Sequence, residues 1–200
     1  RSVSRGLGDV YKRQALNCLK VSNIMTTVVI DFKERKVLAD RQTTQTYYEK
    51  FSIFHRVTGT EPKINKDSFS IEANDKIHKV GDVVLVGSGD RDEVLRLVAE
   101  YINRNHVPKP KTDNVTLAVV RKKGDGLFVE LYDGKKGKHF WNSHVWDFKV
   151  IQGNDSIITF GSGGDYAYGA IKAGVSSEEA MVAASKCDKY TSFEYDVVTL

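Results

Sequence analysis

The stretch Met25-Thr26-Thr27-Val28-Val29-Ile30 places two threonines directly before an apolar, β-branched run. Such residues favour strands, so we predict one strand over 27–32 and a second over 36–43, joined by a charged turn. A threonine inside a chain is a poor nucleophile because no base adjoins its hydroxyl. At a free N-terminus its own α-amine can accept the hydroxyl proton. Together with a second signal far downstream, the stretch suggests a hydrolase with Thr26 as nucleophile, provided that Thr26 becomes residue one.

A glycine-rich turn far downstream, Gly161-Ser162-Gly163-Gly164-Asp165-Tyr166-Ala167, is the second signal. Between the two signals we expect one amphipathic helix that starts at Asp90, after a break at 87–90, and an extended excursion over 45–75. A capping-box pattern, Ser176-Ser177-Glu178-Glu179, opens the last helix. Helices kept apart from mainly antiparallel strands predict an α+β layered fold. The remaining strands are predicted at 76–86 (a pair), 114–121, 127–132, 146–151, 156–160 and 194–200, and a further helix at 165–173.

Residues 1–24 differ in character from the rest of the chain. They lack the apolar core and the small-residue cleavage site of a signal peptide. We expect them to be a non-native flank or a propeptide, followed by a single domain over 25–200. They hold five Lys and Arg but one acid, so the net charge of +4 belongs to them and the remainder is balanced. A basic surface for nucleic acid therefore has no support.

The composition gives little support for a membrane protein, a disulfide-bonded protein, a metalloprotein or a nucleic-acid-binding protein. No apolar run approaches the length of a membrane span. Cys187 is the one cysteine after residue 24, which fits a reducing, cytoplasmic setting. No metal-ligand spacing appears, and we predict neither a metal nor a cofactor. The cluster Lys135-Lys136-Gly137-Lys138-His139-Phe140-Trp141 mixes cations with aromatics, but we read it as a solvated hairpin tip.

Three blocks of residues occur in a fixed order along the chain. They are Met25-Thr26-Thr27-Val28-Val29 with Ala39-Asp40-Arg41-Gln42-Thr43-Thr44; Asp75-Lys76-Ile77 leading to Gly87-Ser88-Gly89; and 161–167 leading to Asp188-Lys189-Tyr190-Thr191. Each block alone is a weak signal, since Gly-Ser-Gly triplets are common turns. Together and in this order they resemble the proteasome β-subunit superfamily, and among its branches the HslV-like peptidases of bacterial or phage type. The resemblance covers 25–200 and implies the four-layer αββα sandwich of N-terminal nucleophile (Ntn) hydrolases.

The resemblance implies roles for the residues that match its motifs. Thr26 matches the nucleophile, and Asp40 matches the aspartate that keeps a site lysine charged. Lys76 matches that lysine, whose ammonium would depress the pKa of the hydroxyl and amine of Thr26. The interval before Lys76 is longer than is usual in the family, so Lys50 or Lys66 is an alternative.

Four more residues match supporting positions. Gly89 is the candidate oxyanion donor through its backbone N–H, with Ser88 as the alternative. Ser162 matches the serine that supports the terminal amine, and Asp188 and Thr191 complete that group. Ser192 and Phe193 replace the glycines that usually follow, which alters the rim of the pocket.

The leading interpretation is a threonine endopeptidase that cleaves peptides or unfolded proteins. The resemblance implies a homo-oligomeric ring and an ATPase unfoldase as partner. Between Gly89 and the next strand there is room for one helix where the family has two, so the central helical region is shortened. This departure favours the alternative of a non-catalytic subunit that serves assembly or partner binding. An amidohydrolase with a non-peptide substrate is also open.

Overall fold

The computed structural model describes residues 18–24, 26–49, 68–72, 76–137, 144–153 and 156–200, and the side chains of these except for 18–24, 43–49 and 68–72. The alternative lysines Lys50 and Lys66 lie outside these ranges, as do 138–141 of the basic and aromatic cluster. Within the described residues, no helix is long and apolar enough to cross a bilayer.

The chain divides into two compact units. The first comprises Arg1–Val21 with Gln45–Phe69, and the second Ser22–Thr44 with Ser70–Leu200. The first unit holds parts of three strands that pair in the order β1-β4-β5, namely β1 (Cys18–Ile24), β4 (Gln42–Glu49) and β5 (Ser68–Glu72). Every candidate site residue described below belongs to the second unit.

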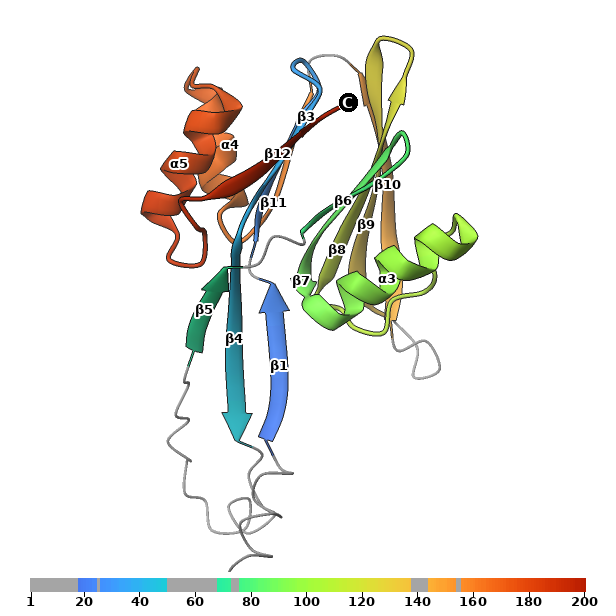
Figure 1. Ribbon diagram of the computed structural model, residues 1–200, viewed down its shortest axis with the longest axis vertical. Helices are drawn as coiled ribbons and strands as arrows, with labels where there is room; N and C mark the ends of the chain where they lie inside the picture. The colour runs from blue at the N-terminus through green and yellow to red at the C-terminus, as the bar shows by residue number, and fades with distance from the viewer. Residues whose placement is uncertain (1–17, 25, 50–67, 73–75, 138–143, 154–155) are drawn as a thin grey trace, which may run out of the picture. The chain divides into compact units, whose positions relative to one another are not determined.

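Two antiparallel sheets form the second unit (Figure 1). The smaller sheet has the order β11-β2-β3-β12, from β2 (Thr27–Asp31), β3 (Lys36–Asp40), β11 (Ile157–Gly161) and β12 (Tyr195–Thr199). The larger has the order β10-β9-β8-β7, with β6 also on β7. Its strands are β6 (Ile77–Val80), β7 (Val83–Asp90), β8 (Val115–Lys123), β9 (Gly126–Lys136) and β10 (His144–Gly153).

Strand β2 is buried on both faces, which explains its unbroken apolar sequence. Val28 and Ile30 point into a core shared with Val84, Val86 and other residues of the larger sheet. Val29 faces the opposite way, onto α4 (Gly164–Lys172) and α5 (Ser177–Cys187). A third cluster lies between α3 (Arg91–Arg104) and the outer face of β7 and β8. Helices thus cover the outer face of each sheet (Figure 1).

Two of the helices start with a side-chain cap, of which the sequence had predicted the one at α5. Asp90 caps α3 by accepting a hydrogen bond from the N–H of Glu93. Ser176 and Glu179 form the predicted capping box of α5. In α3, Val94, Leu97, Val98 and Tyr101 are buried, whereas Ile102, predicted on the same apolar face, is 53% exposed. The α+β class and the three helices are therefore as predicted.

Three segments differ from the prediction. The predicted break at 87–90 is wrong, because Gly87, Ser88 and Gly89 pair with β8 and continue β7. A Cβ on Gly87 would lie 2.6 Å from the side chain of Val94, so this glycine allows α3 to pack on its own strand. The predicted strand over 36–43 is two strands separated at Arg41. The predicted excursion over 45–75 contains strand at its described ends, 45–49 and 68–72.

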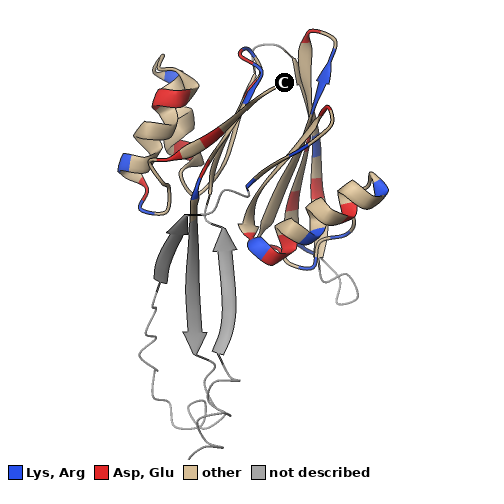
Figure 2. Cartoon of the chain, viewed as in Figure 1, with Lys and Arg blue, Asp and Glu red and all other residues tan. Residues whose placement is uncertain are grey.

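Charged side chains of both signs are interspersed along the described elements (Figure 2). The most buried pair on α3 is Glu93 with Arg96, whose Nε and Nη2 both donate to the carboxylate at 2.7 Å. The N–H of Lys111 also donates to Glu93, at 2.6 Å. Glu93 therefore ties the segment that precedes β8 to the helix. Burial acts to raise the pKa of Glu93, but these hydrogen bonds outweigh it and hold that pKa below its ordinary value of 4.5.

Glu93→Gln should lower the free energy of unfolding by about 1–3 kcal/mol at neutral pH, because it removes charge-assisted hydrogen bonds from a buried group. A carboxyl with a lowered pKa stabilises the fold above its unfolded pKa and loses that contribution as pH falls. The difference from the native chain should thus shrink below pH 4.5. Urea unfolding at several pH values measures it. Glu100→Gln is the control, since Glu100 forms a longer ion pair, 3.4 Å, with the exposed Arg104; equal losses in both variants would contradict the assignment.

Candidate active site

The backbone of Thr26 lies against the glycine-rich turn. Thr26 comes just before β2, and the N–H of Ser162 donates to its carbonyl oxygen at 3.1 Å. Thr27 and Gly161 are opposite each other in the β2–β11 ladder. Gly161 has φ +89°, and a Cβ there would lie 1.5 Å from the carbonyl oxygen of Thr26. Only glycine therefore permits this approach.

The carboxylate of Asp40 is the centre of the site. It is fully buried at the end of β3. Its Oδ1 accepts from the N–H of Thr27 at 2.7 Å and from Nζ of Lys76 at 3.2 Å. Its Oδ2 accepts from the N–H groups of Gln42 and Ser192, at 3.0 and 3.1 Å. Burial raises the pKa of Asp40, and the ammonium of Lys76 and the three backbone donors oppose that rise.

Lys76 is buried with its ammonium on Asp40. It lies just before β6, is 1% exposed, and also donates to the carbonyl oxygen of Gln42. Its ammonium and the Thr26–Thr27 peptide nitrogen share one carboxylate oxygen. The structure thus brings Lys76, the lysine predicted from its motif, to the predicted aspartate. A buried ammonium needs such a partner, because its desolvation is costly.

A second set of polar contacts involves the hydroxyl of Thr27. The hydroxyl of Thr191 donates to Oδ2 of Asp188 at 2.7 Å and lies 2.6 Å from the hydroxyl of Thr27. Asp188 is the C-cap of α5, and both it and Thr191 are buried. The sequence predicted that Asp188 and Thr191 act together, and they do share a hydrogen bond. Their contact is with Thr27, which the sequence analysis read as a strand residue.

Two other predicted residues, Ser162 and Gly89, lie close to neighbouring backbone. Ser162 is exposed, and among the described contacts it reaches Thr26 through its backbone N–H. Gly89 has φ +109°, and a Cβ there would lie 2.2 Å from the carbonyl oxygen of Asn114. Close approach of β8 therefore explains this glycine. Ser88 is buried, and its Oγ lies 3.2 Å from the position of a Cβ on Gly161, beside the backbone of Thr26.

Thr26 itself is fully buried, and its Oγ1 has no hydrogen-bond partner among the described residues. A buried hydroxyl without a partner costs about 1–3 kcal/mol. Such groups are rare in folded proteins and call for an explanation. Here the hydroxyl lies one residue from the N–H that binds Asp40. The hydroxyl of Thr26, which has no hydrogen-bond partner among the described residues, is thus next in sequence to a residue that binds the ionised Asp40–Lys76 pair.

Gly163 is a site residue that the sequence analysis did not single out. A Cβ at this position would lie 2.2 Å from Oγ1 of Thr27 and 2.5 Å from Oγ1 of Thr191. The pair of hydroxyls therefore fits only because residue 163 has no side chain. The sequence did contain a signal for Gly163. One glycine is enough for a turn, so a second glycine in Gly-Ser-Gly-Gly suggests that a side chain is excluded there for another reason.

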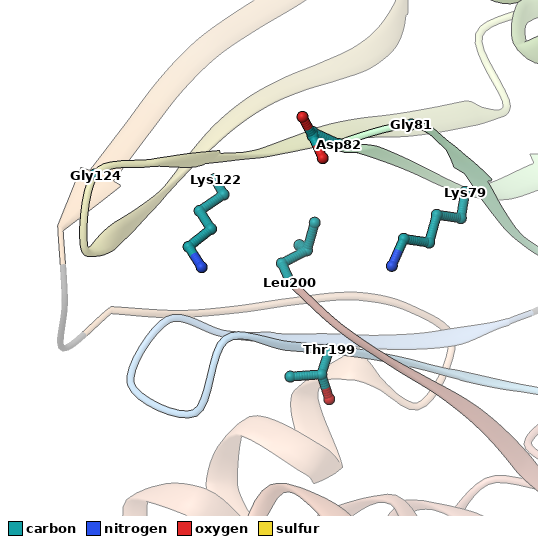
Figure 3. A pocket seen from close by; sticks show the side chains of 7 residues that line it. All are labelled: Lys79, Gly81, Asp82, Lys122, Gly124, Thr199 and Leu200. Atoms are coloured by element: carbon teal, nitrogen blue, oxygen red, sulfur yellow. The ribbon is translucent and has the colours of Figure 1, made fainter.

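A cavity of about 410 Å³ lies at the other end of the smaller sheet (Figure 3). Lys79 and Lys122 extend on either side of Leu200, which follows β12. Thr199 pairs with Lys36, whereas Tyr195 pairs with Asp40, so the length of β12 separates the cavity from Asp40. In the described part of the chain, no group of three His, Cys, Asp or Glu side chains could hold a metal ion.

Comparisons with known proteins find likeness in structure alone. No protein-family model and no curated protein matches the chain. The structure is similar to the crystal structure of eukaryotic HslV from Trypanosoma brucei, with 17% identity, 86% of this chain and 97% of that chain covered, and a TM-score of 0.48. It is also similar to BPH from Thiobacillus denitrificans in complex with epoxomicin, with 13% identity, 86% and 96% covered, and a TM-score of 0.47.

Gly163→Ala should lower the free energy of unfolding by about 1–3 kcal/mol, because its Cβ would separate the hydroxyls of Thr27 and Thr191. Gly169→Ala is the matched control. Gly169 is in α4 with nothing within 4 Å of an added Cβ, so that variant should gain about 0.5–1 kcal/mol. Chemical denaturation of the two variants measures both changes. A Gly163→Ala chain as stable as the native one would show that the hydroxyl pair is not tightly held.

Proposed function

We propose that the chain is a threonine endopeptidase of the Ntn-hydrolase type, with Thr26 as nucleophile once it becomes the N-terminal residue. The observation that carries this proposal is the buried, uncommitted hydroxyl of Thr26 beside the Asp40–Lys76 pair. The domain that performs the reaction is 25–200, folded as a four-layer αββα sandwich with a shortened central helical region. The three separate apolar clusters, one between the sheets and one under each helical layer, support this architecture.

The proposed reaction is acyl transfer. The hydroxyl of Thr26 loses its proton to its own α-amine as Oγ1 attacks a peptide carbonyl carbon. The amine then returns that proton to the leaving amine, which leaves an acyl ester on Oγ1. Water, deprotonated by the same amine, hydrolyses the ester and releases the second product. No cofactor takes part.

Lys76 and Asp40 supply the electrostatics of this scheme. The ammonium of Lys76 favours loss of a proton from the hydroxyl and from the amine, because a nearby positive charge stabilises the deprotonated forms. Asp40 keeps Lys76 charged and fixes the N–H of Thr27. Thr191, itself bonded to Asp188, positions Thr27 through its hydroxyl. Ser162 donates its N–H to the carbonyl of Thr26, and its proposed role is to support the freed amine.

An extended peptide is the substrate that fits the edge of β7. Asn23 and Ile24 pair antiparallel with Asp90 and Gly89, so this edge already accepts an extended segment. Removal of the residues before Thr26 would leave the edge available beside the nucleophile. The N–H of Gly89 is the proposed donor to the oxyanion, and the buried hydroxyl of Ser88 is the alternative.

The setting of the enzyme follows from the motif resemblance. We propose a cytoplasmic homo-oligomeric ring that encloses the site and receives unfolded protein from an ATPase. The segment between α3 and β8 holds no helix among its described residues 105–114, which leaves one helix on that face of the larger sheet. Subunit contacts in such a ring would then differ from those of relatives with two helices.

A non-catalytic subunit is the second candidate, favoured by one observation. In the 200-residue chain β1 leads into Thr26, so the nitrogen of Thr26 is in a peptide bond and cannot act as the base. If the residues before Thr26 are retained, the same fold would serve for assembly or partner binding.

The adduct with epoxomicin, an epoxyketone, separates the two candidates. An epoxyketone reacts with both the hydroxyl and the free amine of an N-terminal threonine, so it reports the two groups together. The chain expressed from Met25 should lose Met25 and gain one adduct on Thr26 by intact mass and peptide mapping. The 200-residue chain, if it is not processed, and Thr26→Ala should gain none. Thr27→Ser, which keeps its hydroxyl and N–H, should still react. A correctly trimmed chain that stays unmodified would support the non-catalytic subunit instead.

A further inference from the structure

Strand β10 is a long edge of the larger sheet. It pairs with β9 along its whole length, from His144 opposite Lys136 to Gly153 opposite Leu127. It stands at the end of the strand order, and in the described part of the chain no second strand pairs with it. One row of its backbone N–H and C=O groups is therefore open to another strand.

The side chains of this edge are unusually apolar for an exposed strand. Phe148 and Val150 are each 48% exposed and Val145 is 36% exposed. Phe148 and Trp146 flank the ring of Tyr132, with ring centroids 4.9 and 5.7 Å from it. Edge strands commonly carry charges or proline that prevent pairing. Here the central residues alternate apolar and charged, with Asp147 and Lys149 on either side of Phe148.

We propose that β10 pairs antiparallel with β10 of a second copy of this chain, on a two-fold axis through Phe148. In that register Phe148 is opposite itself, and Asp147 is opposite Lys149 twice. The apolar residues also match, with Trp146 opposite Val150 and Val145 opposite Ile151. Opposite charges and aromatic or β-branched residues directly across a ladder stabilise it, so the strand is complementary to itself.

Neighbouring registers are excluded by the same two charges. A two-fold antiparallel ladder must be centred on a residue, because opposite residues share the same hydrogen-bonding phase. Centring it on Asp147 would place two aspartates opposite each other, and centring it on Lys149 would place two lysines opposite each other. Like charges directly across a ladder are destabilising. The register through Phe148 is the one that pairs both charges with their opposites.

The charge pattern of β10 favours a second copy of this chain as the partner of the open edge. Asp147 already binds Nζ of Lys135 through Oδ2 at 2.5 Å, which leaves its Oδ1 for an incoming Lys149. Lys149 carries no hydrogen bond or ion pair among the described contacts of the chain. An arbitrary extended peptide would lack the matched charges. The pairing requires no free amine on Thr26, so it can be tested whether or not the chain is a peptidase.

Charge reversal tests the pairing through the oligomeric state of the 200-residue chain. Sedimentation equilibrium over a concentration series should show a monomer–dimer or higher even-numbered assembly. Lys149→Asp places two aspartates opposite each other at two positions and should raise the dissociation constant by about tenfold or more. The swap Asp147→Lys with Lys149→Asp restores opposite charges and should recover most of the affinity. Lys122→Asp, an exposed position on β8, makes the same charge change away from the edge and should have no effect.

Disulfide trapping tests the register directly. With Cys18 and Cys187 changed to serine, Phe148→Cys should form a disulfide-linked dimer on mild oxidation, because the two sulfurs would lie opposite each other on the axis. Val150→Cys is equally exposed but would be opposite Trp146, so it should cross-link poorly. Thermal unfolding of each variant confirms that it is folded. A monomer at all concentrations, or cross-linking at residue 150 equal to that at 148, would overturn the proposal.

Discussion

The buried carboxylate of Asp40 is the interaction on which the rest of the site depends. Its oxygens accept from donors that start β2, follow β3, precede β6 and precede β12. Taking a carboxylate and an ammonium out of water is costly unless both are well paired. The four donors satisfy the carboxylate and so fix four chain segments around one point. The stability of the site and its proposed chemistry therefore rest on the same group.

Thr27 is held by hydrogen bonds and therefore restricts the position of Thr26, which directly precedes it. Its N–H binds Asp40 and its hydroxyl meets Thr191, so both its backbone and its side chain are held. Gly161 and Gly163 then admit close packing where any side chain would collide. Among the described residues, the hydroxyl of Thr26 has no hydrogen-bond partner. In the proposed mechanism, these contacts would hold the residues around that oxygen in position before the reaction.

The sequence predicted the parts of the structure that periodicity and capping determine. The strand at β2, the three helices and the capped start of α5 could be predicted from residue patterns, whereas the grouping of Asp40 with Lys76 was implied only by the motif resemblance. Gly87-Ser88-Gly89-Asp90 was misread, because these residues favour turns and only the packing of α3 on Gly87 shows why they are in a strand. The role of Thr27 could not be read, since a threonine in a β-branched run looks like any strand residue. Which lysine binds Asp40 also depended on tertiary structure.

The double-mutant cycle of Asp40 and Lys76 tests the central claim most directly. In the chain that begins at Met25, Asp40→Asn and Lys76→Met should each cost about 3–5 kcal/mol of unfolding free energy, because each leaves a buried polar group unmatched. The double variant should recover much of that loss yet react with epoxomicin more slowly than the native chain by about a hundredfold or more. If the double variant regains stability but reacts slowly, then the Asp40–Lys76 ion pair both stabilises the fold and supports the reaction of Thr26. A double variant that reacts at the native rate would contradict the account.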